Sequence, residues 1–211
     1  ENLYGAVASM WQGLKQRKQA GPKIRVYNPD LEQNGWQSTH TAIEIINDDM
    51  PFLVDSVVSA LNTMNLPVLM LIHPIVHVTR DDKGAVTMLA GRGGETDETA
   101  SESVLHIEVT QQPPGARHEE IEARLAKVLA SVRASVEDWP SMMAELDAQI
   151  AELKASPPPV PAEDLAEGLD FLQWLHDNHF TFLGHREYVY EHRDGRVYAH
   201  LDEDKCLGVL R

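Results

Sequence analysis

Ten histidines make metal coordination the first chemistry to consider in this sequence. His176 and His179 are three residues apart in a predicted helix, so both imidazoles would lie on one face and could share an ion. Two further ligands would be needed, and His185 and Glu187 are merely nearby in the sequence. We interpret His176 and His179 as ordinary helix-end histidines. A small metal enzyme built around them is an alternative.

A second candidate site is the segment Asp48-Asp49-Met50-Pro51-Phe52, which separates a predicted strand from a predicted helix. Paired carboxylates can act as general acid and base. Aspartate before a helix with proline in its first turn is also a typical helix start, so we interpret Asp49 as the N-cap. The free N–H groups of such a junction can bind a small anion or an amino-acid carboxylate. We therefore take these five residues as the candidate effector or interface site.

Other kinds of chemistry have little support in the sequence. The single cysteine, Cys206, excludes internal disulfides and a cysteine-based zinc cluster, and no segment marks a positioned base for it. The glycine cluster over residues 91–94 precedes acidic residues and a strand instead of a helix, which predicts a surface loop and not a dinucleotide site. We expect no catalytic, cofactor-binding or metal-binding residue anywhere in these 211 residues.

The elements that would position the Asp48-to-Phe52 junction follow from periodicity. Alternating or β-branched residues predict strands over residues 23–28, 41–47, 69–79, 85–89 and 103–110. Helical spacing predicts helices over residues 2–18, 52–65 and 116–139, the last restarting at Pro140 and running to about residue 155. The first of these helices has a single apolar stripe comprising Leu3, Val7, Met10, Trp11 and Leu14.

From residue 41 the order is strand, helix, strand, strand, strand, helix, which is the order of a ferredoxin-like fold. We expect an α+β two-layer sandwich with a mostly antiparallel sheet and both helices on one face. The other face must be covered by the helix over residues 2–18, the helix over residues 142–153, or a second copy. An uncovered face or an unpaired edge would favour a homo-oligomer.

A proline-rich run over residues 156–161 predicts a stiff linker. We expect a regulatory domain over residues 1–155 before it and a second module over residues 162–211 after it. The second module has one helix and one hairpin, turning at Asp194-Gly195, which is marginal for an independent core. The sequence begins with Glu1 and not with Met. We expect it to be a piece of a longer chain, and we expect the second module to be truncated in it.

Composition narrows the range of partners. Acidic residues number 33 and basic residues 18, and the resulting net charge of −15 repels phosphate backbones, so we expect no nucleic-acid partner. No stretch approaches the roughly 18–20 apolar residues of a membrane helix, so we expect no membrane partner. Because the chain has a single cysteine, a reducing compartment fits best and we expect a cytoplasmic protein.

Several strings of the sequence resemble a known family. NDDMPFLVDSV (residues 47–57) resembles the strand-to-helix junction of an ACT domain, a small regulatory module with a ferredoxin-like fold. The same string resembles the N-terminal region of the large bacterial NAD-specific glutamate dehydrogenases. So do HPI (residues 73–75), the turn at residues 80–81, FLQWL (residues 171–175), NHFTFLG (residues 178–184) and REY (residues 186–188).

This resemblance implies a chain several times longer than 211 residues. In that family, tandem ACT-like segments precede a catalytic domain and a C-terminal helical domain, and the enzyme oxidises L-glutamate to 2-oxoglutarate and ammonia with NAD. The glutamate-binding lysines and the nucleotide site belong to the later catalytic region. The resemblance therefore implies NAD for the parent enzyme and assigns no catalytic residue here.

Phe52 departs from the pattern of the resembled family. Ligand-binding ACT domains usually have glycine directly after the proline of the junction, where a ligand approaches the backbone, and a phenylalanine there would fill or shield the pocket. We expect a non-catalytic regulatory and oligomerisation segment, whose partners are the remainder of its own chain and further copies of it. A small amino acid is the candidate effector, and the alternative is a free-standing amino-acid-binding sensor module.

Overall fold

The computed structural model describes residues 2–18, 21–91, 96 and 98–211. It contains two compact units, Glu1–Ala130 and Ser131–Arg211, whose boundary lies inside helix α4 (Ala116–Ala155). The proline-rich residues 156–161 form no helix or strand. The division into a domain over residues 1–155, a linker and a second module stays a prediction. Apart from Gly91, the predicted glycine-rich loop lies outside the described residues.

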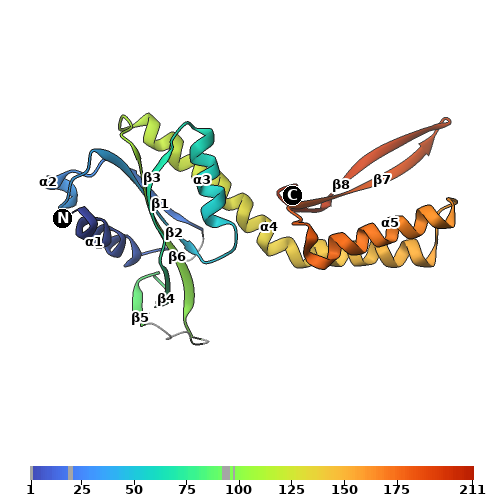
Figure 1. Cartoon of the computed structure of the whole chain (residues 1–211), viewed down its shortest axis with the longest axis horizontal. Helices are drawn as coiled ribbons and strands as arrows, with labels where there is room; N and C mark the ends of the chain where they lie inside the picture. Colours follow the sequence, from blue (N-terminus) through green and yellow to red (C-terminus); the bar gives the residue numbers. More distant parts are fainter. Residues whose placement is uncertain (1, 19–20, 92–95, 97) are drawn as a thin grey trace. The chain divides into compact units, whose positions relative to one another are not determined.

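A six-stranded antiparallel sheet forms the centre of the first unit (Figure 1). Its strands are β1 (Lys23–Tyr27), β2 (His40–Asp48), β3 (Val68–Ile72), β4 (Ile75–Arg80), β5 (Val86–Ala90) and β6 (Ala100–Thr110). The order is β1-β2-β6-β4-β5, and β3 also pairs with β6. The predicted strand over residues 69–79 is divided at His73-Pro74, because proline has no N–H to donate to the ladder. The first strand joins the same sheet, as the sequence predicts.

One face of the sheet is covered by α3 (Leu53–Thr63) and the first part of α4, as Figure 1 shows. The apolar faces of these helices are fully buried at Leu61 and Leu125. Alternate residues of the central strands, such as Ile43, Ile45 and Ile107, are also fully buried. This arrangement is the α+β, ferredoxin-type sandwich that the order of elements predicts.

Helix α1 (Asn2–Leu14) covers the opposite face, which is the first of the three alternatives considered. Met10 and Leu14 pack in one cluster with Ile46, Val78 and Val104 from the sheet. The face left free by α3 and α4 is therefore closed within the chain, and the argument for oligomerisation from an uncovered face does not hold for this sheet.

The predicted single stripe of α1 is in fact two stripes. Met10 and Leu14 are buried against the sheet, whereas Leu3, Val7 and Trp11 are 63%, 51% and 40% exposed. The buried residues of the inner stripe are four apart in the sequence. Ala6 is the third of them, before Met10 and Leu14. The outer residues form an apolar ridge on the far side of the helix.

The segment after α1 is tied to the β4–β5 hairpin by backbone hydrogen bonds. The N–H of Arg17 donates to Gly84 O at 3.0 Å, and the N–H of Val86 donates to Lys15 O at 3.0 Å. Gly84 has a φ of 81°, in the region that favours glycine, as the predicted turn over residues 81–84 requires. These bonds fix the position at which the chain leaves α1.

The second unit consists of the later part of α4, α5 (Ala162–Trp174), a kinked turn η1 (Leu175–His179) and the hairpin β7 (Gly184–Arg193) with β8 (Arg196–Gly208). Helix α4 continues through Pro140, so the predicted restart there is wrong. Val132 before the proline and Met142 after it are both buried, so the helix is packed on either side of the missing N–H. Among the described residues, the helices are too short or too polar to cross a bilayer.

Gly84→Ala tests the tie between α1 and the hairpin. An added Cβ would lie 1.9 Å from Arg17 O at a positive φ, so we expect the free energy of unfolding in urea to fall by about 3 kcal/mol. Gly35→Ala is the matched control, because Gly35 also has a positive φ but nothing within 4 Å. Its expected loss is about 1 kcal/mol. Equal losses in the two variants would contradict a structural role for this tie.

Candidate functional site

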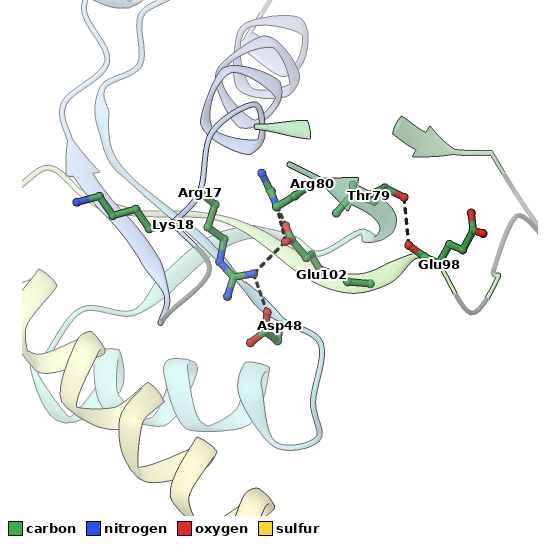
Figure 2. A pocket seen from close by; sticks show the side chains of 9 residues that line it. Arg17, Lys18, Asp48, Thr79, Arg80, Glu98 and Glu102 are labelled. Carbon is green, nitrogen blue, oxygen red and sulfur yellow. Dashed lines mark hydrogen bonds and ion pairs between the residues drawn. The ribbon is translucent and has the colours of Figure 1, made fainter. Parts of the chain in front are cut away.

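A hollow of about 260 Å³ lies where the end of the α1 segment meets β2, β4 and β6 (Figure 2). Its lining includes Asp48, the first residue of the predicted junction site, together with charged residues from three other segments. These are Arg17, Lys18, Arg80, Glu98 and Glu102.

Glu102 is the centre of this cluster. Its Oε1 accepts hydrogen bonds from Arg17 Nη1 at 3.0 Å and from Arg80 Nε at 2.7 Å, and its Oε2 accepts from Arg80 Nη2 at 2.7 Å. The side chains of Arg17, Arg80 and Glu102 are 3%, 8% and 3% exposed. A buried carboxylate in a bidentate pair with one guanidinium and in contact with a second is fully neutralised by them.

Both guanidinium groups also have further partners in the protein. Arg17 donates to Asp48 Oδ1 at 2.8 Å and, from Nε and Nη2, to Gly21 O. Arg80 donates to Gly84 O and Leu14 O. Every nitrogen of both groups thus has at least one partner in the protein, and a ligand carboxylate would have to share these groups with Glu102. The cluster joins α1, β2, β4 and β6, and its geometry is that of a structural clamp.

The structure assigns different roles to the two aspartates of the predicted junction site. Asp48 pairs with Arg17 at the rim of the hollow. Asp49 contacts β6, since its N–H donates to Ser101 O and its Oδ1 accepts from Ser103 Oγ at 2.5 Å. The interpretation of Asp49 as an N-cap is therefore wrong, because the sheet uses its carboxylate. The N-cap of α3 is Phe52, which makes no side-chain capping bond.

Met50 and Pro51 lead the chain from β2 into the turn before α3, and Phe52 completes it with a φ of 70°. Such a backbone conformation favours glycine, so this residue carries strain that glycine would lack. The Phe52 side chain is 48% exposed. The junction thus keeps the glycine-type backbone conformation and adds a large apolar group at the surface.

A second buried polar cluster lies beneath α1. His106 on β6 is fully buried between two buried carboxylates, with Nδ1 3.6 Å from Glu44 Oε1 and Nε2 3.6 Å from Glu108 Oε1. The Trp36 ring lies beside the imidazole at a centroid distance of 5.8 Å. The alternation of residues 103–110 predicts a half-buried strand, but α1 covers the polar side as well. The sequence pattern therefore did not predict that the polar face of β6 is buried.

The neighbouring polar groups decide the charge state of Glu44. Burial alone would raise its pKa, but the pKa is lowered because His106, Ser9 and Tyr27 place polar hydrogens around the carboxylate and Arg25 adds a nearby positive charge. Tyr27 Oη donates to Glu44 Oε1 at 2.8 Å. Burial, followed by the Glu44 charge, raises the pKa of Tyr27, so the phenol stays a donor. The cluster thus holds an ionised carboxylate under α1.

In the second unit, His176 and His179 have separate partners. His176 Nε2 lies 3.2 Å from Asp147 Oδ1, and His179 Nδ1 lies 3.0 Å from Trp174 O. This agrees with their interpretation as helix-end histidines. Cys206 is a buried free thiol, and its Sγ donates to Asp202 O at 3.5 Å.

Comparison with known proteins identifies the first unit. Residues 1–125 match the family described as glutamate dehydrogenase, ACT1 domain. The chain belongs to this family. The whole chain is also 42% identical to a protein of Halomonas elongata and 36% identical to one of Pseudomonas aeruginosa, both named NAD-specific glutamate dehydrogenase. It spans 13% of the length of each of these relatives. The ACT1 match confirms both the resemblance and the fold expected from it.

Removing the central carboxylate tests the clamp of the ACT1 domain. Glu102→Gln leaves the buried guanidinium group of Arg80 without its counter-ion and that of Arg17 with Asp48 alone, and we expect the free energy of unfolding to fall by about 3–5 kcal/mol. Urea denaturation followed by circular dichroism measures this loss. Glu120→Gln is the control, because Glu120 pairs with Arg117 at 2.7 Å but is 59% exposed. That exposed pair is worth less than about 1 kcal/mol, and a similar loss in both variants would contradict the clamp.

Glu44→Gln tests the buried carboxylate under α1. Because the native pKa is lowered, ionised Glu44 stabilises the fold above the ordinary glutamate pKa of 4.5, and this stabilisation is lost as the pH falls below it. The wild-type chain should therefore exceed Glu44→Gln in stability at neutral pH. The difference should shrink between about pH 5 and pH 3. Urea denaturation across this range checks it, and a pH-independent difference would contradict the assignment.

Proposed function

We propose that this chain is a non-catalytic regulatory and oligomerisation segment of a larger NAD-dependent glutamate dehydrogenase. The observation that carries the proposal is the match of residues 1–125 to the glutamate dehydrogenase ACT1 family, within a chain that spans 13% of relatives named NAD-specific glutamate dehydrogenase. In this proposal, the oxidation of L-glutamate with NAD takes place in the part of the larger protein that these residues do not include.

The charges around the Asp48-to-Phe52 junction favour an assembly role over capture of an amino acid. An amino-acid effector needs a cation for its carboxylate, and Arg17 and Arg80 already pair with Glu102 and with backbone carbonyls, which leaves Lys18 as the remaining cation in the lining of the hollow. Phe52 replaces the glycine of ligand-binding ACT domains. We retain the amino-acid sensor as the second candidate, because Asp48 still places a partly exposed carboxylate at the rim of a hollow.

The outer ridge of α1, formed by Leu3, Tyr4, Val7 and Trp11, is the surface we propose for assembly. These side chains are 40–81% exposed on a helix whose other side is buried. The β1 edge is a weaker candidate, because Glu122 Oε1 accepts the hydrogen bond from the N–H of Val26 at 2.9 Å. An apolar ridge on a chain with a net charge of −15 favours docking at one defined patch.

The second unit is proposed as the start of a further module. Its hairpin exposes Val189, Tyr190 and Val197 at 53–66%, and α5 exposes Phe171 at 57%. A two-stranded hairpin is marginally stable alone, and apolar residues of this kind are usually buried by neighbouring elements. We propose that further parts of the same protein cover them, and that the protein works in the cytoplasm, where a free thiol such as Cys206 stays reduced.

Two measurements on the purified 211-residue chain test the function. We expect no formation of NADH from L-glutamate and NAD, and no heat of binding from a panel of amino acids at millimolar concentration in calorimetry. Turnover would refute the non-catalytic assignment. Stoichiometric binding of one amino acid would instead favour the sensor.

Val7→Glu tests the assembly surface. A carboxylate in the centre of the ridge must be desolvated on docking, so we expect the oligomer seen by light scattering to dissociate to monomers that remain folded by circular dichroism. Gln12→Glu adds the same charge to an exposed position on the polar side of the same helix and should leave the assembly intact. A wild-type monomer at high concentration would contradict the oligomer.

A further inference from the structure

Three potential metal ligands converge in the second unit, at the base of the β7–β8 hairpin. Glu145 on α4 and His185 and Glu187 on β7 each present one ligand atom, and these atoms all lie within 4.8 Å of one another. All three residues are partly buried. His185 and Glu187 are two residues apart on one strand, so their side chains share a face. From the convergence of these three residues, we propose that this chain binds a divalent transition-metal ion of the zinc class.

The imidazole of His185 provides an independent observation. Its Nε2 is buried and has no hydrogen-bond partner among the described residues. A buried polar nitrogen without a partner is costly, and a metal ion is one of the groups that satisfy it. One imidazole nitrogen with two carboxylate oxygens is a ligand set that zinc accepts, with water completing the coordination.

The helix and the hairpin are fixed to each other next to the site. Asp138 on α4 accepts hydrogen bonds from the N–H of Gly208 at 2.7 Å and from Arg211, and Ser135 Oγ donates to Leu183 O at 3.0 Å. Glu145 is seven residues after Asp138, so both lie on the same face of the helix. The α4 face that holds the hairpin thus also presents the third ligand.

The strand pairing is irregular at this point. His185 pairs with Leu207 and Glu187 with Asp202, so one residue of β7 faces four of β8, residues 203–206. Bulges of this kind redirect side chains and are frequent beside functional sites. Here the bulge places Lys205 on β8 so that its Nζ lies 2.6 Å from Glu187 Oε1.

Lys205 is the counter-charge that the metal ion would replace. Its Nζ donates a hydrogen bond to Glu187 Oε1 at 2.6 Å, so it already neutralises one of the proposed ligands. A divalent cation held by Glu145, His185 and Glu187 competes with that group, so Lys205 weakens metal binding without being a ligand.

Titration of the metal-stripped, tag-free 211-residue chain with Co²⁺ and Zn²⁺ tests the site. We expect one saturable visible d–d absorption band of Co²⁺, abolished by stoichiometric Zn²⁺. His185→Gln and Glu145→Gln should each weaken Zn²⁺ binding in calorimetry by about tenfold or more, and Lys205→Gln should strengthen it. His200→Gln is the control, because His200 is exposed on the same hairpin and pairs with Glu191, and it should bind as the wild type does.

Two results would overturn the proposal. One is the absence of a saturable Co²⁺ band up to millimolar concentration, and the other is unchanged Zn²⁺ binding in both His185→Gln and Glu145→Gln. Circular dichroism of each variant establishes that it is folded, and either folded variant suffices for the comparison. The metal titration is independent of activity and of oligomeric state, so the regulatory function and the metal site can fail separately.

Discussion

The first unit depends on the neutralisation of carboxylates that lie in a closed layer. Glu44, Glu102 and Glu108 point from the two central strands into the space under α1, where each is 6% exposed or less. An ionised group removed from water needs a counter-charge or a donor. Glu102 obtains two guanidinium groups from segments on opposite sides of it, so α1, β4 and β6 must be in place together. Helix α1 is therefore a layer of the fold and not an appendage.

This constraint also shapes what the domain can offer to partners. The two arginines nearest the β2–α3 junction pair with Glu102, which leaves Lys18 as the remaining cation in the lining of the hollow. The side of α1 that is not used against the sheet is apolar and exposed. A domain that satisfies its charges internally and presents an apolar ridge outward has the properties of an assembly module, which is the function proposed for it.

The second unit is organised differently, because it has few buried residues and many polar contacts at its base. Asp138, Ser135 and Asp147 on α4 each hold a segment of the α5-to-β8 region by hydrogen bonds or ion pairs. The hairpin extends from this base with apolar side chains exposed on it. The proposed metal ion would add a further cross-link where the bulge already brings Glu145, His185 and Glu187 together.

The sequence by itself determined the elements and their order, because the period of apolar residues within a strand or helix is a local property. It predicted β2, α3 and β6 and the ferredoxin-type sandwich, and its strings identified the family. Only the tertiary structure decided how the charges pair. Glu102 and Arg17 are 85 residues apart, and no local pattern relates them. Asp49 fits the N-cap pattern, yet it bonds to Ser103, 54 residues away. Such choices depend on which elements pack together, since a polar side chain takes the partner that packing brings within reach.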